Sequence, residues 1–283
     1  GKQVNEYILL LASPNVKTWD MALTFMVLAT LGAWGLSLLK PLGLHDPFWA
    51  TALTHVFLDL FSEGWFVLGV LGVAWSVLDE QTTTARHWSL RLVGAGLPFT
   101  FVLALPESGL SAGLKLVGCV GGALVGVGLL AIAAQLWRQT PARRAWWWSV
   151  PLALLAAKAL AQLGNSVLPG VWWAGEHGLR IAYLHLMLLG FVSLGLAAAA
   201  RHAWGAATTL GLPAFYGAVG LLLLSLLPLT SWWPAAWGGP GAVRAAAWAA
   251  LLPVLAAAWM LGRGLAGRAK ADARGTAAAV KTA

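Results

Sequence analysis

The chain has 283 residues, of which 59% are hydrophobic and only 10% are charged. Soluble domains are about 45–50% apolar and about 25% charged, so this composition excludes an ordinary soluble domain and indicates an integral membrane protein. The formal net charge of +8 does not call for a nucleic-acid partner, because most Lys and Arg residues fall in short loops and in the tail. The lipid bilayer is the expected partner, and a bacterial inner membrane is the expected location.

Eight stretches of the sequence are long and apolar enough to cross a bilayer as helices. In chain order they are 18–39, 47–77, 88–105, 112–137, 146–164, 178–201, 208–229 and 242–263. The loops between them are short, and no polar stretch is long enough to build a soluble domain. We therefore predict an all-α, polytopic membrane helix bundle. It forms a single transmembrane domain over 1–265, followed by a mobile, basic cytoplasmic tail at 266–283.

The positive residues concentrate in alternate loops. They are Arg86 and Arg91 after the second span, Arg138, Arg143 and Arg144 after the fourth, Arg201 at the end of the sixth, Arg263 at the end of the eighth, and four more in the tail. Each of the other loops carries a single Lys or Arg. Because cytoplasmic loops are enriched in Lys and Arg, eight spans place both termini in the cytoplasm.

The second span contains the segment THVFLDLFSEGW, in which three ionisable residues interrupt an apolar run. His55, Asp59 and Glu63 stand at i, i+4 and i+8, so a helix presents them as one narrow stripe. Ionisable groups inside a membrane are costly and nearly always face the bundle interior or a wet cavity. We therefore expect an inward-facing stripe, with Asp59 and Glu63 as candidate proton-carrying or catalytic groups.

The fifth span supplies a counter-charge. Lys158, Gln162 and Asn165 share one helix face, and Lys158 lies too deep to reach the interface easily. The simplest account is an ion pair between Lys158 and either Asp59 or Glu63. Two interpretations stay open: a structural pair that fixes helix register, and a proton relay or tuned amine that takes part in chemistry.

A second histidine, His185, lies in the sixth span, at nearly the same distance from the outer end of its span as His55 is from the outer end of the second. The two spans run in the same direction, so the two imidazoles are expected at one depth. Such a pair could ligate one heme iron, as in a heme b site. It could instead bind copper or zinc, with Asp59 as a third ligand.

Two segments carry a resemblance to a known family. YLHLMLLGFVSLGLAAAARHAWG and THVFLDLFSEGWFVLGVLGVAW resemble the heme-copper oxidase subunit I superfamily, and more closely its small relatives, the NnrS-like and subunit-I-like membrane proteins. The matching positions are His185, Gly190 and Arg201 in the first segment and His55, Gly64, Trp65 and Phe66 in the second.

The resemblance implies that histidines near the outer side hold heme or copper. It also implies an oxidoreductase-like role with electrons, oxygen or nitric oxide, with a small gas ligand or another redox membrane protein as partner. The chain departs from the superfamily in having eight expected spans rather than twelve and in lacking an adjacent pair of histidines. The resemblance therefore implies at most one heme or metal site.

Three functions are compatible with these residues. The first is a heme-binding redox or gas-responsive protein that uses His55 and His185. The second is an intramembrane zinc hydrolase with the same histidines and Asp59 as ligands and Glu63 as general base, although the HExxH signature is absent. The third is a proton-coupled transporter or heme-handling protein in which the charged set, including Lys158, forms the working site.

Overall fold

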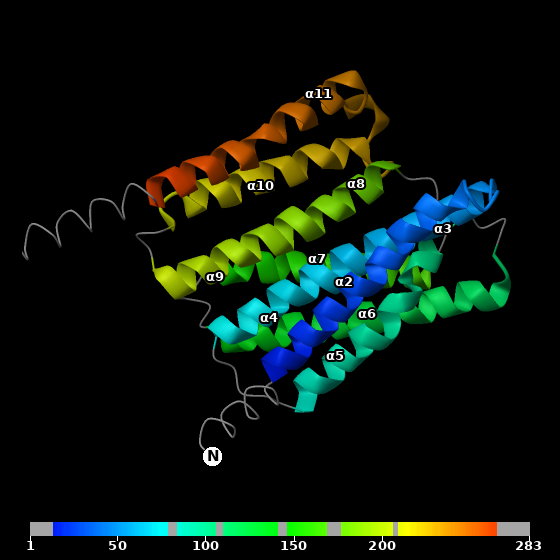
Figure 1. The fold of residues 1–283 in the computed structure, drawn as a ribbon. Helices are drawn as coiled ribbons and strands as arrows, with labels where there is room; N and C mark the ends of the chain where they lie inside the picture. The colour runs from blue at the N-terminus through cyan, green and yellow to red at the C-terminus, as the bar shows by residue number, and fades with distance from the viewer. Residues whose placement is uncertain are drawn as a thin grey trace, which may run out of the picture. The chain divides into compact units, whose positions relative to one another are not determined.

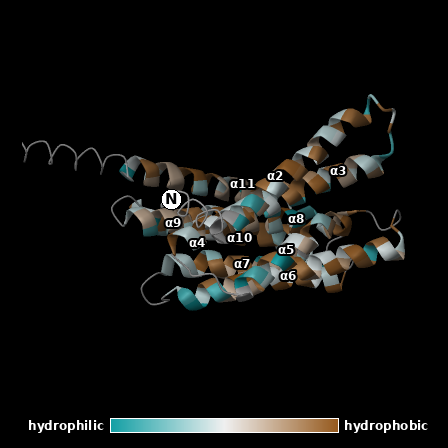
Figure 2. Cartoon of the chain, turned by 60° about the horizontal axis from the view of Figure 1, so that its bottom comes forward, coloured by the Kyte–Doolittle hydropathy of each residue, from teal (hydrophilic) through white to brown (hydrophobic). Residues whose placement is uncertain are grey.

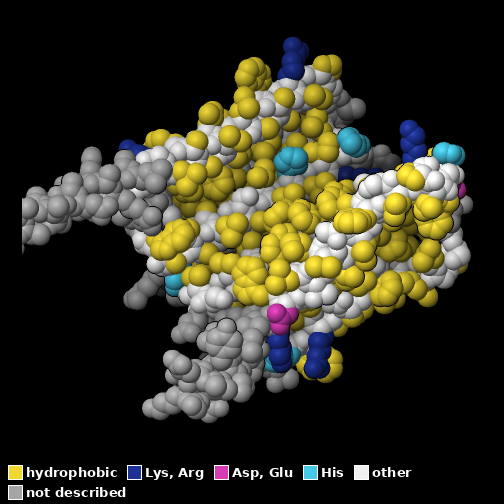
Figure 3. All heavy atoms as spheres, in the orientation of Figure 1, with side chains coloured by type: hydrophobic (Ala, Val, Ile, Leu, Met, Phe, Trp, Pro, Cys, Tyr) yellow, Lys and Arg dark blue, Asp and Glu magenta, His cyan; other side chains and the backbone are white. Residues whose placement is uncertain are grey.

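The computed structural model describes residues 14–78, 84–105, 110–140, 146–168, 177–205 and 209–264, and every regular element in these ranges is helical. Seven helices are long and apolar enough to cross a membrane: Lys17–Leu39, Pro47–Val77, Ala112–Gln139, Trp146–Val167, His177–Trp204, Leu212–Leu229 and Pro240–Gly264. Hydrophobic residues recur along the helices (Figure 2), and their side chains cover most of the face seen in Figure 3. The predicted all-α, polytopic membrane protein is confirmed. The predicted tail at 266–283 lies outside the described residues.

The third predicted span, 88–105, is helical but is not one of these seven. It consists of the α-helix α5 (Thr84–Gly96) followed directly by the 3₁₀-helix η2 (Leu97–Ala104). Pro98 stands at the start of the 3₁₀ segment, where its missing N–H interrupts the α-helical hydrogen bonds. At about 1.5 Å per α residue and about 2.0 Å per 3₁₀ residue, the combined element is roughly 35 Å long, which is comparable to the hydrocarbon core.

The chain divides into two compact units, Gly1–Gly195 and Leu196–Ala283. In the second unit, α10 (Leu212–Leu226) packs against α11 (Pro240–Ala249), and the latter continues as helix to Gly264. The five candidate site residues, His55, Asp59, Glu63, Lys158 and His185, all lie in the first unit, so the site is described within that unit alone.

The described residues of the first unit form seven α-helices and three helices of other types. The α-helices are α2 (Pro14–Leu39), α3 (Pro47–Asp59), α4 (Leu68–Val77), α5, α6 (Ala112–Gln139), α7 (Trp146–Val167) and α8 (His177–His185). The second span, made of α3, η1 and α4, packs against η2, and η2 packs against α6. In turn α6 packs against α7, α7 against η4, and η4 against η1, which closes a ring. Helix α2 lies along the outside of the second span (Figure 1).

Two segments of the ring are π-helical. They are η1 (Leu60–Val67), which follows α3, and η4 (Leu186–Ser193), which follows α8 and leads into α9 (Leu194–Trp204). The five-residue reach is visible at their ends, where Leu68 N–H bonds Glu63 C=O and Leu194 N–H bonds Leu189 C=O. π-Helical turns are rare and concentrate at functional sites. Here the two π-helical segments, η1 and η4, pack against each other.

Glycines allow neighbouring helices to approach closely. A Cβ added at Gly96 would stand 2.3 Å from the backbone oxygen of Gly121, so α5 and α6 touch backbone to backbone. At Gly122 and Gly126 an added Cβ would meet Ser166 and Leu163 of α7 at 2.3 and 2.6 Å. Gly122 and Gly126, four residues apart on α6, therefore allow α7 to pack closely against α6.

Candidate functional site

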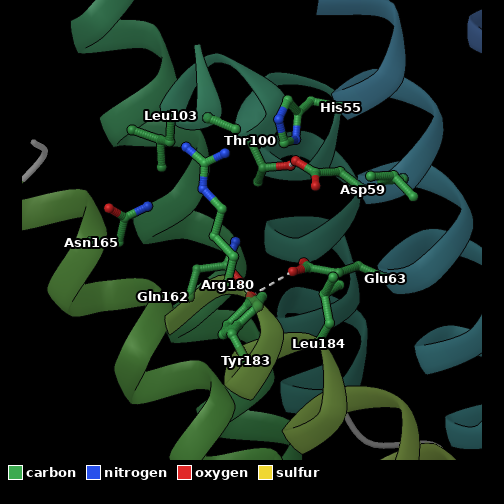
Figure 4. A pocket seen from close by; sticks show the side chains of 12 residues that line it. His55, Asp59, Glu63, Thr100, Leu103, Gln162, Asn165, Arg180, Tyr183 and Leu184 are labelled. Carbon is green, nitrogen blue, oxygen red and sulfur yellow. Dashed lines mark hydrogen bonds between the residues drawn. The ribbon is translucent and has the colours of Figure 1, made fainter. Parts of the chain in front are cut away.

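A polar pocket of about 90 Å³ lies inside the first unit, between the second span, η2, α7 and α8 (Figure 4). It is lined by His55, Leu58, Asp59, Glu63, Thr100, Leu103, Ala104, Gln162, Asn165, Arg180, Tyr183 and Leu184. Since water in the liquid occupies about 30 Å³ per molecule, the pocket has room for a few water molecules or one very small solute.

The stripe predicted on the second span faces this pocket. His55, Asp59 and Glu63 all line it, although Glu63 lies in the π-helical segment and the other two in α3. Helix α3 begins at a defined point, because the Asp46 carboxylate accepts a hydrogen bond from the N–H of Phe48. The cap fixes the start of the span from which the stripe descends.

A cluster of four side chains forms the floor of the pocket: Glu63, Lys158 and Gln162, which are buried, and Tyr183, which is half-buried. Lys158 Nζ lies 2.6 Å from Glu63 Oε1, with side-chain exposures of 0% and 7%. The Tyr183 hydroxyl lies 2.8 Å from the same Glu63 oxygen and 2.9 Å from Gln162 Oε1. Lys158 also donates to Gln162 Oε1. Of the two predicted ion-pair partners of Lys158, Asp59 and Glu63, the structure pairs Lys158 with Glu63.

The geometry of this cluster permits a proton to move. Two donors, the Lys158 ammonium and the Tyr183 hydroxyl, each reach the same two acceptors, Glu63 Oε1 and Gln162 Oε1. A tyrosine hydroxyl carries one proton, so Tyr183 bonds one of these acceptors at a time or shares its proton between them. The second oxygen of Glu63, Oε2, is buried and has no hydrogen-bond partner within the described part of the chain.

Asp59 lies one turn nearer to His55. Its Oδ2 accepts a hydrogen bond of 3.0 Å from the Thr100 hydroxyl of η2. The Asp59 carboxylate also lies within Coulombic range of Glu63 and Lys158. Two carboxyl groups therefore share one buried ammonium.

Arg180 and Asn165 bring unmet polar atoms into the same pocket. Arg180 is half-buried, and its guanidinium extends toward Thr100 and Leu103 (Figure 4). Its buried Nε has no hydrogen-bond partner among the described residues, and the same holds for Oδ1 of Asn165, a residue that is 8% exposed.

His185 is not one of the residues that line this pocket. Its Nδ1 lies 2.8 Å from the carbonyl oxygen of Ile181, one turn earlier in α8, which leaves Nε2 for another partner. Among the described residues, no group of three or more His, Cys, Asp or Glu side chains is arranged to hold a metal ion. The pairing of His55 with His185 on one heme or metal stays a prediction.

Thr100, Arg180 and Tyr183 take part in the site without having been predicted. A signal was present in the sequence, because Arg180, Tyr183 and Leu184 stand at i, i+3 and i+4 and must share a helix face. In the sequence analysis Arg180 was counted only as the single positive charge near one of the outer loops, so this shared helix face was not predicted. Thr100 carried no signal of its own, because the 3₁₀ geometry that aligns it with Leu103 is not visible in the sequence.

Comparison with known proteins does not assign the chain to a family. No protein-family model, no curated protein and no solved structure matches the chain. The function therefore has to be argued from the site itself.

Proposed function

We propose that this protein is a proton-coupled membrane transporter whose working site is the polar pocket together with the cluster of Glu63, Lys158, Gln162 and Tyr183. The single observation that carries the proposal is the shared hydrogen-bonding of Glu63 Oε1 by Lys158 and Tyr183 at the floor of a pocket that also contains Asp59. Intramembrane carboxylates and their partners are typical of proton relays in transporters.

The charges of the site support a proton-binding role. Asp59 and Glu63 are two potential negative charges near one ammonium, Lys158. Among Asp59, Glu63 and Lys158, one proton on either carboxyl group balances the charge, and like charges close together favour such sharing. Arg180, which lines the same pocket, adds a second positive charge to the site. Tyr183 can pass a proton along the cluster because its hydroxyl contacts both acceptors.

The surrounding helices also suit a transport site. Substrate sites of secondary transporters lie where membrane helices are interrupted, because irregular turns expose polar backbone and permit movement. Here η1 and η2 supply part of the pocket wall, and the paired η4 packs against η1. Beyond Glu63 the second span continues with buried apolar residues, including Leu71 and Trp75, so the pocket is closed in that direction. A transporter would open this end by shifting the π-helical segments.

Proton flux into proteoliposomes tests the proposal. Vesicles containing a pH-sensitive dye are challenged with small acids, amines and neutral solutes, and protein-free vesicles give the baseline. We expect at least one solute to drive a proton flux that Glu63→Gln and Asp59→Asn abolish. Asp20→Asn, which makes the same chemical change at an exposed carboxylate of α2, should retain it. Absence of any such flux, or equal flux in the Glu63 and Asp59 variants, would contradict the proposal.

A second candidate function is heme or metal ligation by His185. It is favoured by the hydrogen bond from its Nδ1 to Ile181, since histidines that bind metals usually have the other ring nitrogen bonded to a carbonyl or carboxylate. Of the two histidines predicted as ligands, His55 lines the pocket and His185 does not. A bound heme would supply electron transfer or gas binding.

Visible absorption spectra separate this candidate from the first. Protein purified from heme-replete cells should show a Soret band that shifts with dithionite and is lost in His185→Ala. His202→Ala, at an exposed histidine of α9, is the control. A colourless wild-type protein would rule heme out, and elemental analysis of the same sample would do so for copper and zinc.

A further inference from the structure

We propose that the pocket binds a small, planar, singly charged oxyanion, of the formate, bicarbonate or nitrate class, between Arg180 and Asn165, and that Asp59 takes up one proton when this anion binds. The inference names a substrate class for the transport function proposed above and rests on that function for its coupling. Binding of the anion is a separate property and can be measured separately.

The positive charge of Arg180 favours an anion in the pocket. Its side chain lines the pocket, has no carboxylate within ion-pair distance in the described part of the chain, and has an unsatisfied buried Nε. His55, which lines the same pocket, can add only positive charge to it. A half-buried guanidinium that has no counter-ion among the described residues favours an anion, and its planar fork matches two oxygens of a planar oxyanion.

Asn165 supplies polar atoms in the same pocket as Arg180. Asn165 is more than nine-tenths buried, lines the same pocket and has an unsatisfied Oδ1. Its amide can bond an anion through the nitrogen, or accept from a ligand hydroxyl, such as that of bicarbonate, through the oxygen. The pocket, of about 90 Å³, has room for a small anion of this kind.

Binding of the anion is expected to be coupled to the uptake of a proton. An anion at Arg180 enters a pocket that already contains the carboxylates of Asp59 and Glu63. Glu63 is bonded to Lys158 and Tyr183, whereas Asp59 has only the neutral Thr100 hydroxyl as a hydrogen-bond partner among the described residues. Repulsion between the anion and Asp59 is relieved when Asp59 is protonated, so anion binding and proton binding favour each other.

The groups that face Asp59 come from four elements, and they set the expected pH dependence. They are His55 and Glu63 on the second span, Thr100 on η2, Lys158 on α7, and Arg180 and Tyr183 on α8. Lowering the pH protonates Asp59 or His55, and either change favours an anion. Affinity should therefore rise as pH falls, by up to about tenfold per pH unit when one proton is taken up per anion.

Binding is measured with sodium formate, sodium bicarbonate and sodium nitrate on detergent-solubilised full-length protein. The readouts are the ligand-dependent rise of the unfolding midpoint and saturation-transfer NMR of formate, with chloride at equal ionic strength as reference. Arg180→Gln should weaken binding by at least about tenfold, because it removes a charge-assisted bond. Arg244→Gln, at an exposed arginine of α11, should leave it unchanged.

The Asp59→Asn variant isolates the coupling. It should bind the anion at least as tightly as wild type, with little dependence on pH, whereas His55→Gln should keep most of the pH dependence. If Asp59→Asn does not fold, the proton taken up on binding, read with a pH dye in weakly buffered wild-type protein, gives the same information. No anion-specific signal, or binding unaffected by Arg180→Gln, would overturn the site and leave a pocket for water only.

The two proposals fail in different ways. If the anion binds and a proton is taken up, but no flux occurs in vesicles, the transport function is wrong and the binding site stands. If Glu63-dependent proton flux occurs with other solutes but no oxyanion binds, the substrate class is wrong and the transport function stands.

Discussion

At the scale of single residues, Glu63 connects the pocket to the buried lysine. The spacing of His55, Asp59 and Glu63 was sufficient to predict an inward stripe, because helix periodicity and the cost of charge in lipid leave no other direction. The same argument found Lys158 but did not distinguish Asp59 from Glu63 as its partner. That choice depends on the rotation of the second span in its π-helical segment, which is set by packing.

The buried pair should contribute strongly to stability when one partner is removed. Lys158→Met leaves Glu63 without its cation, and breaking a buried ion pair in this way costs about 3–5 kcal/mol. The double variant, in which Glu63→Gln is added, should recover most of this loss because no uncompensated charge remains. Reversible unfolding in mixed detergent measures both values. A loss of less than about 1 kcal/mol in the single variant would show that Glu63 already carries a proton.

At the scale of elements, the irregular helices distinguish the structure from the sequence prediction. Apolar runs predicted the spans, and the second was placed at its observed limits, 47–77. The π-helical turns at Leu60–Val67 and Leu186–Ser193 were not predicted, because five-residue hydrogen bonds leave no periodic mark in so apolar a stretch. The 3₁₀ segment had a partial signal in Pro98, which indicated an interruption but not its form.

Close contact between α5 and α6 holds η2 at the pocket and gives an element-scale prediction. Gly96→Ala should destabilise the protein by about 1–3 kcal/mol, because the new Cβ would meet the Gly121 carbonyl oxygen, which cannot move aside cheaply. Gly164→Ala in α7 is the matched control. Nothing lies within 4 Å of its added Cβ, and alanine is the better helix former by about 0.5–1 kcal/mol. Equal unfolding midpoints for the two variants would argue against the close packing.

At the scale of the whole molecule, composition alone was sufficient to predict a polytopic helical membrane protein. Two compact units within the chain were not visible in the sequence, since the apolar spans look alike on both sides of Gly195. The position of the termini relative to the membrane stays a prediction from the distribution of Lys and Arg. The resemblance to the oxidase superfamily likewise stays a prediction, because it rests on two short segments.

Cysteine labelling tests the predicted orientation. In a background with Cys119→Ala, a cysteine at exposed Leu42, between the first two spans, should react with an impermeant maleimide in intact cells. A cysteine at exposed Arg138, in the last turn of the helix Ala112–Gln139, should react only after permeabilisation. The reverse pattern would place the termini outside. Labelling of both positions in intact cells would contradict any topology in which these ends lie on opposite sides.

The central claim is that protons bind to the carboxyl groups of the pocket, and infrared difference spectroscopy between low and high pH tests it most directly. Wild-type protein in lipid should show the C=O band of a buried neutral carboxylic acid at low pH, shifted by deuterium exchange. The band should lose intensity in Asp59→Asn and in Glu63→Gln but not in Asp20→Asn. An identical difference spectrum in wild type and both pocket variants would mean that these carboxyl groups carry no exchangeable proton, and the proposed mechanism would be wrong.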